Sequence, residues 1–174
     1  SKGKGAGLLK EPAKMQKLLK LIVENSGVPV TVKIRSGWDE TSVNAVETAL
    51  RAQDAGISGL FIHGRTRKQG YSGKVDYDII RKVKEALKIP VIASGDALTP
   101  DLIKKLFDET GCNGVSIARG ALGNPWIFRE TAALLNGEAA PPRPDVNEKA
   151  RTMKKHLAAD IEFHGEKTGV IRFR

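Results

Sequence analysis

Residues 90–118, PVIASGDALTPDLIKKLFDETGCNGVSIA, decide the fold that we expect for this chain. The stretch begins with the β-rich run Pro90–Ser94, continues with an amphipathic helix pattern, and ends with a second β-rich run, Gly114–Ala118. Residues 99–101 (TPD) are typical of a helix start, because they provide an N-cap hydroxyl, a first-turn proline and a first-turn acid. Gly111 is a typical stop residue. The stretch therefore predicts one strand–helix–strand unit.

The same alternation extends toward the N-terminus. Two earlier β-rich runs, Val30–Arg35 and Gly59–His63, precede the quoted stretch at a spacing of about 30 residues. Apolar residues at helical spacing lie between and after the runs, over residues 15–23, 43–50, 79–87 and 125–135. Regular alternation of strands and helices predicts an α/β fold with a parallel sheet covered by helices.

Two architectures fit this alternation, an open doubly wound sheet and a (β/α)8 barrel. A closed barrel needs eight strands and runs to about 250 residues, whereas this chain has 174 residues and four β-rich runs. If the fold is a barrel, we expect the chain to hold half of one. The first residue is not Met and the last residues lie within a patterned stretch, so we expect both ends to be cut.

The composition is that of a globular protein with an excess of positive charge. The chain has 29 Lys and Arg against 20 Asp and Glu, a net charge of +9, which favours an anionic partner such as nucleic acid. A single cysteine, Cys112, excludes a disulfide framework and a multi-cysteine metal site. No apolar run is long enough to cross a membrane, and residues 1–7 lack the apolar core of a signal peptide. We expect a cytoplasmic protein without a metal site.

The composition changes after Gly137. Residues 138–144 contain three prolines in four positions, which cannot lie inside a helix, so this segment is expected to be a linker. A new amphipathic helix is expected to start near Val146, and its apolar face has no evident partner in the chain. We therefore expect residues 1–137 to form the α/β domain and residues 145–174 to begin a second domain.

Lys33 is the sharpest candidate for function. The carboxyl ends of strands bind ligands in parallel β/α folds, and Lys33 lies between Val32 and Ile34, so strand alternation places it on the opposite face. A lysine that points into a strand-lined interior requires an anion or a ligand to offset its desolvation. The alternative is a lysine on the solvent or helix-covered face, with its ammonium group reaching water.

His63 and two glycine-containing turns follow the other expected strands. His63 is either a hydrogen-bonded structural residue or a ligand-binding residue, and both interpretations stay open. Residues 94–96 (Ser-Gly-Asp) and 119–120 (Arg-Gly) resemble phosphate-binding loops, in which glycine lets backbone N–H groups approach an anion.

Two further features carry alternatives of their own. Residues 65–73 form a run of cations with one aromatic residue, which is either solvated surface or a nucleic-acid contact that combines phosphate neutralisation with stacking. Cys112 precedes the last β-rich run, at the amino end of that strand, where residues of barrel folds serve stability. We therefore expect Cys112 to be structural.

Several of these motifs, taken in order, resemble the tRNA-dihydrouridine synthase family of bacterial type. The motifs are Val32–Gly37 (VKIRSG), His63–Arg67 (HGRTR), Pro90–Asp96 (PVIASGD) and Ala118–Phe128 (ARGALGNPWIF), with further likeness over residues 5–12 and 164–174. The resemblance covers essentially the whole chain, and the ordered series is far more specific than any one motif.

The resemblance implies an FMN-binding (β/α)8 TIM barrel followed by a helical tRNA-binding domain. Residues 1–137 would then be the C-terminal half of the barrel, with four parallel β-α units, and residues 145–174 the start of the helical domain. The implied activity is the FMN-dependent, NADPH-linked reduction of uridine to 5,6-dihydrouridine in tRNA, by a cytoplasmic protein expected to be a monomer when intact.

The resemblance also assigns roles to individual residues. The cofactor-binding residues that it implies are Lys33, His63, Ser94, Gly95, Asp96, Ala118, Arg119 and Gly120. The tRNA-binding residues that it implies are Arg65, Arg67 and Lys68. The family's catalytic cysteine lies in a Gly-Cys-Pro motif expected upstream of Ser1, so no catalytic acid is expected in this chain, and the chain alone is expected to be inactive and to bind FMN weakly.

Two residues depart from the family's usual pattern. The family usually has Asn where Ser94 stands and Gly where Ala118 stands. Serine keeps a hydroxyl donor and acceptor but lacks the reach of an amide. Alanine adds a methyl group where backbone should approach a phosphate, which is tolerable if φ is negative.

Two other functions remain as alternatives. Another FMN- or phosphate-binding TIM-barrel oxidoreductase would explain the polar strand ends, but it would not explain the charge of +9 or the helix after the linker. A basic RNA-binding module without catalysis would explain the charge and the absence of a catalytic acid.

Overall fold

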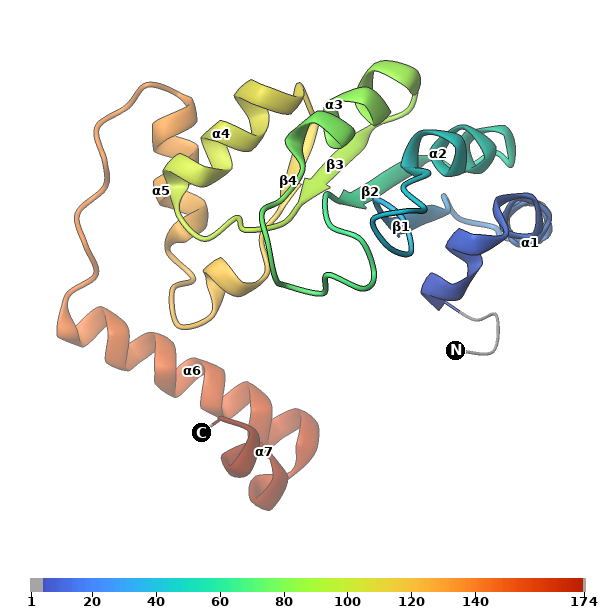
Figure 1. The fold of residues 1–174 in the computed structure, drawn as a ribbon. Helices are drawn as coiled ribbons and strands as arrows, with labels where there is room; N and C mark the ends of the chain where they lie inside the picture. Colours follow the sequence, from blue (N-terminus) through green and yellow to red (C-terminus); the bar gives the residue numbers. More distant parts are fainter. Residues whose placement is uncertain (1–4, 174) are drawn as a thin grey trace. The chain divides into compact units, whose positions relative to one another are not determined.

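The computed structural model describes residues 5–173 and shows an α/β unit followed by a helical hairpin (Figure 1). The strands are β1 (Thr31–Arg35), β2 (Gly59–His63), β3 (Val91–Ser94) and β4 (Gly114–Ser116). The helices are η1 (Gly5–Lys10), α1 (Pro12–Glu24), α2 (Ala45–Asp54), α3 (Tyr77–Ala86), α4 (Pro100–Thr110), η2 (Arg119–Ala121), α5 (Ile127–Leu135), α6 (Val146–His164) and α7 (Glu166–Phe173).

The sheet confirms the expected parallel topology. Its strands lie in the sequential order β1-β2-β3-β4, and each neighbouring pair is parallel. The register aligns Arg35 with His63, His63 with Ser94, and Ser94 with Ser116, so one row of residues crosses the carboxyl ends of the strands. The last strand ends at Ser116 and is shorter than the predicted run to Ala118.

The helix boundaries follow local signals. The hydroxyl of Thr99 accepts a hydrogen bond from the backbone N–H of Leu102 (3.3 Å), and Gly111 closes α4 in the left-handed region at φ 64°. Asp76 caps α3 in the same way, accepting from the N–H of Ile79 (3.0 Å). These caps satisfy backbone groups that a helix terminus leaves without partners.

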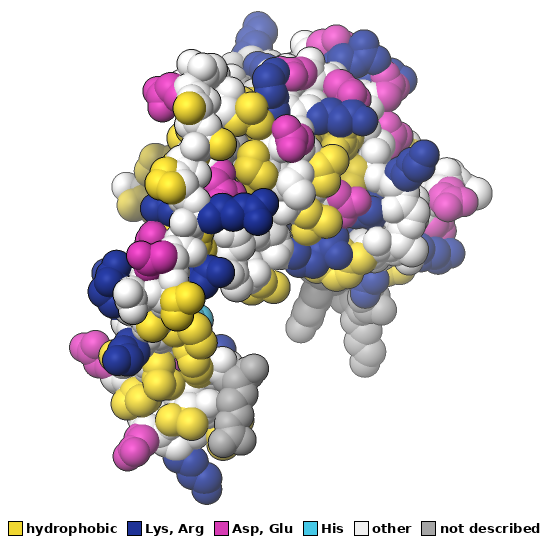
Figure 2. Space-filling view, turned by 90° about the vertical axis from the view of Figure 1, so that its left-hand side faces the viewer, with side chains coloured by type: hydrophobic (Ala, Val, Ile, Leu, Met, Phe, Trp, Pro, Cys, Tyr) yellow, Lys and Arg dark blue, Asp and Glu magenta, His cyan; other side chains and the backbone are white. Residues whose placement is uncertain are grey.

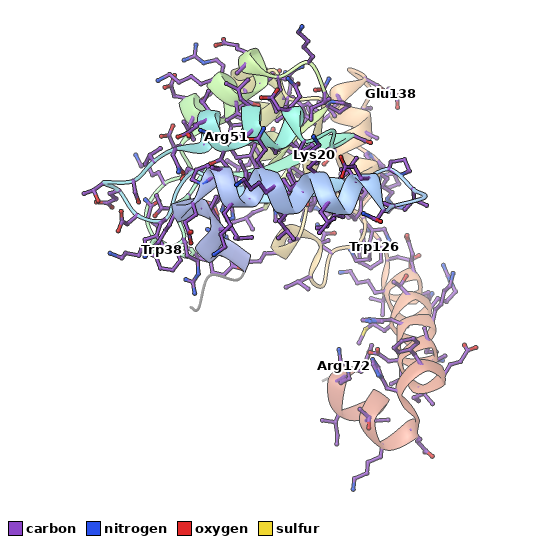
Figure 3. The ribbon with its side chains drawn as sticks, turned by 90° about the vertical axis from the view of Figure 1, so that its right-hand side faces the viewer. Lys20, Trp38, Arg51, Trp126, Glu138 and Arg172 are labelled. Atoms are coloured by element: carbon purple, nitrogen blue, oxygen red, sulfur yellow. The ribbon has the colours of Figure 1, made fainter. Side chains whose placement is uncertain are left out.

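The two faces of the sheet differ in what covers them. Helices α1 to α5 pack side by side in chain order, and α2, α3 and α4 contact the strands on one face (Figure 1). On that face Ile34, Leu60, Ile62, Val91 and Ala93 are buried. Figure 3 shows α1 in front of α2, to which it is joined by a hydrogen bond from Arg51 to Gln16 (3.2 Å). On the opposite face Lys33 is exposed and Phe61 only partly buried, whereas His63 at the carboxyl end is buried.

Residues 139–174 form a second compact unit, separated from the first after Glu138. Helices α6 and α7 pack against each other, and Gly169 permits this because a Cβ there would lie 2.7 Å from the carbonyl oxygen of Asp160. Helix α6 buries no residue, and Figure 2 shows hydrophobic side chains gathered on the displayed face of this unit. The exposed large apolar side chains of the unit are Val146, Met153, Phe163 and Ile171.

Two classes of feature are absent from residues 5–173. None of the helices described there is both long and apolar enough to span a bilayer. The same residues contain no cluster of three or more His, Cys, Asp or Glu side chains suited to hold a metal ion.

Leu106 provides a test of the packing between α4 and the sheet. It is fully buried, so Leu106→Ala should lower the free energy of unfolding by about 2–5 kcal/mol through lost burial and a residual cavity. The matched control is Leu21→Ala on α1, whose side chain is 60% exposed and should change stability by less than about 0.5 kcal/mol. Urea denaturation of both variants checks this, and equal losses would show that α4 does not pack as described.

Candidate functional site

A hollow of about 200 Å³ lies at the carboxyl edge of the sheet. Of the eight expected cofactor-binding residues, seven line it: Lys33, His63, Ser94, Gly95, Asp96, Ala118 and Arg119. Gly120 is not in its lining. A Cβ on Gly120 would lie 2.2 Å from the carbonyl oxygen of Ala97, so this glycine permits close packing of two loops.

Lys33 lies on the sheet face turned away from the helices, as strand alternation predicts. Its neighbour Ile34 is buried beneath the helices, and the Lys33 ammonium donates a hydrogen bond to the hydroxyl of Ser94 (3.1 Å). Partial burial, and after it the nearby charge of Arg35, lower the pKa of Lys33. The helix-covered face is therefore excluded for Lys33, whose side chain remains exposed to solvent in the described residues. The hydroxyl of Ser94 serves as its hydrogen-bond partner.

His63 is buried beside Lys33, and its Nε2 atom has no hydrogen-bond partner among the described residues. Burial, with smaller contributions from the charges of Arg35 and Lys33, lowers the pKa of His63 to about 4. The ring is therefore neutral at pH 7. A buried polar atom without a partner is costly, so this nitrogen is suited to meet a polar group of a ligand.

Gly95 packs directly against the ring of His63. Its φ of 124° lies in the region that favours glycine, and a Cβ there would approach Cδ2 of His63 to 2.9 Å. Ala118, on the other side of the hollow, has a φ of −117°, which lies outside the left-handed region that favours glycine.

The structure argues against the expected tRNA-binding role of Arg65, because this residue is buried. Its side chain is 3% exposed, and its guanidinium makes two hydrogen bonds to the carboxylate of Asp96 (2.9 and 2.6 Å) and two to the carbonyl oxygen of Gly73 (3.2 and 2.6 Å). A buried cation needs a counter-charge, and Asp96 supplies it. The Arg65 guanidinium therefore lies beneath the loop that follows β2 and does not present its charge to solvent.

Asp96 also accepts a hydrogen bond from Arg119 (2.8 Å), which comes from the loop after β4. The hydrogen bonds and charge of Arg65, with the charge of Arg119, outweigh partial burial and hold the pKa of Asp96 below its usual range. The carboxylate therefore joins the loops that follow β2, β3 and β4.

Five residues of the lining were not among the predicted site residues, and they are Arg35, Tyr71, Ala97, Leu98 and Ser116. The Tyr71 ring is 65% exposed and lies beneath two guanidinium groups, those of Arg119 (4.5 Å to the ring centroid) and Arg35 (5.9 Å). Arg35 also donates to the carbonyl oxygen of Gly70 (2.8 Å). The available signal for Arg35 was its spacing of two residues from Lys33, which puts both on one face of a strand.

Arg67 and Lys68 are exposed and lie outside the lining of the hollow. Their backbone N–H groups donate to the carbonyl oxygens of Gly37 and Trp38 (2.9 Å each), which fixes the loop after β2 against the loop after β1. Lys68 forms an ion pair with Asp39 (2.9 Å), and Figure 3 labels Trp38 on this loop. Both cations are thus exposed on a loop whose backbone is fixed by hydrogen bonds to the loop after β1.

Cys112 lies where the sequence predicts. It is buried between α4 and the amino end of β4, and its thiol is 3.9 Å from the carbonyl oxygen of Leu106. The hollow lies at the carboxyl edge, so Cys112 takes no part in it.

The electrostatics of the hollow favour an anion. Lys33, Arg35 and Arg119 contribute positive charge to its lining, and Asp96 is the only acidic residue among the lining residues. The charge of Asp96 is already matched by the buried Arg65. A site of this kind can bind a phosphate group and stabilise negative charge that develops on a nearby oxygen.

Comparison with known proteins gives consistent matches over the whole chain. The sequence model of the family described as dihydrouridine synthase (Dus) matches residues 1–174. The chain is 41% identical over 170 residues to tRNA-dihydrouridine synthase B of Pseudomonas putida, covering 98% of this chain and 50% of that protein. It is 42% identical over 166 residues to probable tRNA-dihydrouridine synthase 1 of Synechocystis sp., covering 95% of this chain and 47% of that protein.

The chain thus spans about half the length of the curated relatives that it matches. Among solved structures, a crystal structure of mandelate oxidase with 3,3-difluoro-2-hydroxy-3-phenylpropionic acid matches with a TM-score of 0.43 at 15% identity. That match covers 70% of this chain and 50% of the other.

The lowered pKa of His63 predicts a pH dependence of stability. The unfolded chain takes up the proton near pH 6.5 and the folded chain only near pH 4, so the free energy of unfolding should fall as the pH falls through this window. The expected loss from this residue is on the order of 1–3 kcal/mol. Urea denaturation between pH 7 and pH 4 should show a smaller loss for His63→Asn than for the wild type. His156→Asn, a change of an exposed histidine on α6, is the control and should keep the wild-type slope.

Proposed function

Because this chain belongs to the dihydrouridine synthase family, we propose that the intact protein reduces a uridine of tRNA to 5,6-dihydrouridine, with FMN as the bound flavin and NADPH as the reductant. The observation that carries this proposal is the cationic hollow at the carboxyl edge of the sheet. Residues from all four strands or the loops that follow them meet there, although they are widely separated in sequence.

The sheet supports the barrel part of the proposal. Parallel sheets are normally covered on both faces, yet here the helices cover one face and the other carries Lys33, Phe61 and Ile92 only half-covered or exposed. A barrel interior filled by further strands would complete such a face. We assign residues 1–137 to the last four β-α units of a (β/α)8 barrel, and residues 145–174 to the start of the helical tRNA-binding domain.

The residues of the hollow fit FMN. The unpartnered Nε2 of His63 and the hydroxyl of Ser94 offer hydrogen-bonding groups to a polar ring edge. Gly95 leaves room where a side chain would collide with His63, and Arg119 supplies a cation for the phosphate. We propose that these residues, with Lys33, Asp96, Ala118 and Gly120 around them, form this protein's part of the flavin site.

FMN reduced by NADPH would supply the hydride for the uracil ring. The role of Lys33 is electrostatic, because its ammonium group is held by Ser94 and lies in a partly desolvated, cationic site. It would stabilise negative charge that develops on a carbonyl oxygen during hydride transfer. Reduction of the uracil double bond also needs a proton for the carbon that does not receive the hydride. Cys112 lies at the opposite edge of the sheet, so this proton would come from another part of the protein, as the family's Gly-Cys-Pro motif implies.

Arg67 and Lys68 would contact the tRNA backbone. Both are exposed on a loop fixed by backbone hydrogen bonds at the carboxyl edge, next to the hollow that would bind flavin and uracil. Cations on a rigid rim neutralise phosphates at a small entropic cost.

The proposal is tested on the purified intact protein. A visible flavin spectrum, oxidation of NADPH in the presence of unmodified tRNA, and a mass increase of two hydrogens in one tRNA uridine would support it. Flavin binding without affinity for tRNA would favour another flavin oxidoreductase, and salt-sensitive tRNA binding without flavin would favour a non-catalytic RNA-binding module.

Lys33→Ala should slow hydride transfer to tRNA about 10²–10³-fold, because it removes a preorganised positive charge from the reacting centre. Stability should change little, since the side chain lies outside the helix-covered core. Pre-steady-state oxidation of the reduced flavin by tRNA measures the effect. Lys82→Ala, on the outer helix α3, is the matched control. Unchanged rates in Lys33→Ala would refute the electrostatic role.

Arg67→Gln should weaken tRNA binding without changing flavin binding. The loss of one phosphate contact should lower the slope of log affinity against log salt concentration by about 1. Titrations of tRNA at several salt concentrations measure this, and Arg81→Gln on α3 is the matched control. An unchanged slope would remove Arg67 from the tRNA-binding surface.

A further inference from the structure

Asp96 makes contacts that are unusual for a residue expected to bind a phosphorylated cofactor. A carboxylate repels a phosphate, yet Asp96 lines the cationic hollow. Its backbone lies in the left-handed region at φ 48°, which aspartate and asparagine tolerate better than other residues with a Cβ. Asp96 therefore has an unusual backbone conformation for a residue with a Cβ, and its side-chain contacts show what this conformation allows.

Both carboxylate oxygens are already engaged by protein. Oδ1 and Oδ2 accept from the two terminal nitrogens of Arg65 in a bidentate pair, and Oδ1 accepts a further hydrogen bond from Arg119 (2.8 Å). Arg65 is buried and cannot leave without exposing an unpaired charge to the interior. Asp96 thus accepts three hydrogen bonds from protein cations, and its charge is matched without a ligand.

The three charges do not cancel. The single negative charge of Asp96 faces the positive charges of Arg65 and Arg119, so it can neutralise only one of them. The buried Arg65 is the cation that requires Asp96 as its counter-charge. Arg119 is 44% exposed, keeps its charge, and is oriented between the Asp96 carboxylate and the face of the Tyr71 ring. A guanidinium held on two sides loses little further freedom when it binds an anion, which strengthens the interaction.

We propose that Asp96 is a positioning residue that does not contact the cofactor but holds Arg119 ready to bind the phosphate of the flavin, while Arg65 prevents Asp96 from cancelling the charge of Arg119. This inference rests on the proposed function, since it names the anion as a flavin phosphate. It predicts that Asp96 contributes to the preference for FMN over riboflavin, which has the same ring system and lacks the phosphate.

The test compares the dissociation constants of FMN and riboflavin for the intact, flavin-free protein, measured by quenching of flavin fluorescence. Asp96→Asn keeps the shape of the side chain and tolerates the same φ. It should weaken FMN binding by about tenfold, because Arg119 loses the partner that orients it and must be ordered when the phosphate binds, and it should change riboflavin binding by less than about twofold.

Asp96→Asn also leaves Arg65 without its counter-charge, so the variant could fold poorly. The double variant Arg65→Met/Asp96→Asn removes both members of the buried pair and should restore folding. It should still lose the preference for FMN. Adding Asp96→Asn to Arg119→Gln should cause little further loss, because Asp96 acts only through Arg119. Asp78→Asn on α3, where Asp78 pairs with Arg81 and Lys82, is the matched control and should keep the wild-type preference.

Other outcomes would overturn the inference in distinct ways. Tighter FMN binding by Asp96→Asn would mean that the carboxylate only repels the phosphate. Equal losses for FMN and riboflavin would mean that Asp96 only supports the fold. A wild-type protein that binds neither flavin would overturn the proposed function itself, whereas a wild type that prefers FMN, with the preference unchanged in both variants, would overturn only the role of Asp96.

Discussion

Side chains along a strand alternate between the two faces of the sheet, and the functional half of this structure depends on that constraint. Ile34, Ile62 and Ala93 point to the helices and are buried, so the residues beside them must point the other way. Parallel strands in register then bring Lys33 and Ser94, which are 61 positions apart, into a hydrogen bond. The same alternation that builds the core therefore assembles the hollow.

The hollow brings several cations together where they are partly shielded from water, and this lowers the pKa of its basic residues. Burial, with smaller contributions from neighbouring cations, lowers the pKa of Lys33, of Arg35 and of His63. Each shift indicates that one more cation is unfavourable there, and an anionic ligand would relieve the repulsion. The charge distribution thus agrees with the flavin phosphate that we propose for the site.

The loop after β2 is held in place by two guanidinium groups, one from the loop itself and one from β1. Arg65, near the start of the loop, donates a hydrogen bond to the carbonyl oxygen of Gly73 near its end. Arg35 of β1 donates to the carbonyl oxygen of Gly70. These guanidinium groups hold the backbone that carries Tyr71 and the exposed cations Arg67 and Lys68. A loop that displays charge toward a nucleic acid is thereby fixed by charges that do not face solvent.

The sequence by itself determined the alternation of strands and helices, the cap and stop residues of α4, and most of the residues that line the hollow. It could do so because strand alternation, N-cap chemistry and glycine stops act over a few neighbouring residues, as at Thr99 and Gly111. Lys33 and His63 were predictable because each lies in or at the end of a β-rich run whose other face is apolar.

Only the tertiary structure decided which charges are buried and which are free. Arg65 and Arg67 look alike in the basic run, yet Arg65 is buried because Asp96, 31 positions away, lies within hydrogen-bond distance, whereas Arg67 is exposed. Pairing of this kind depends on where separate loops meet in space. Local sequence carries no record of such distances, so the division of the arginines into structural and available ones became visible only with the fold.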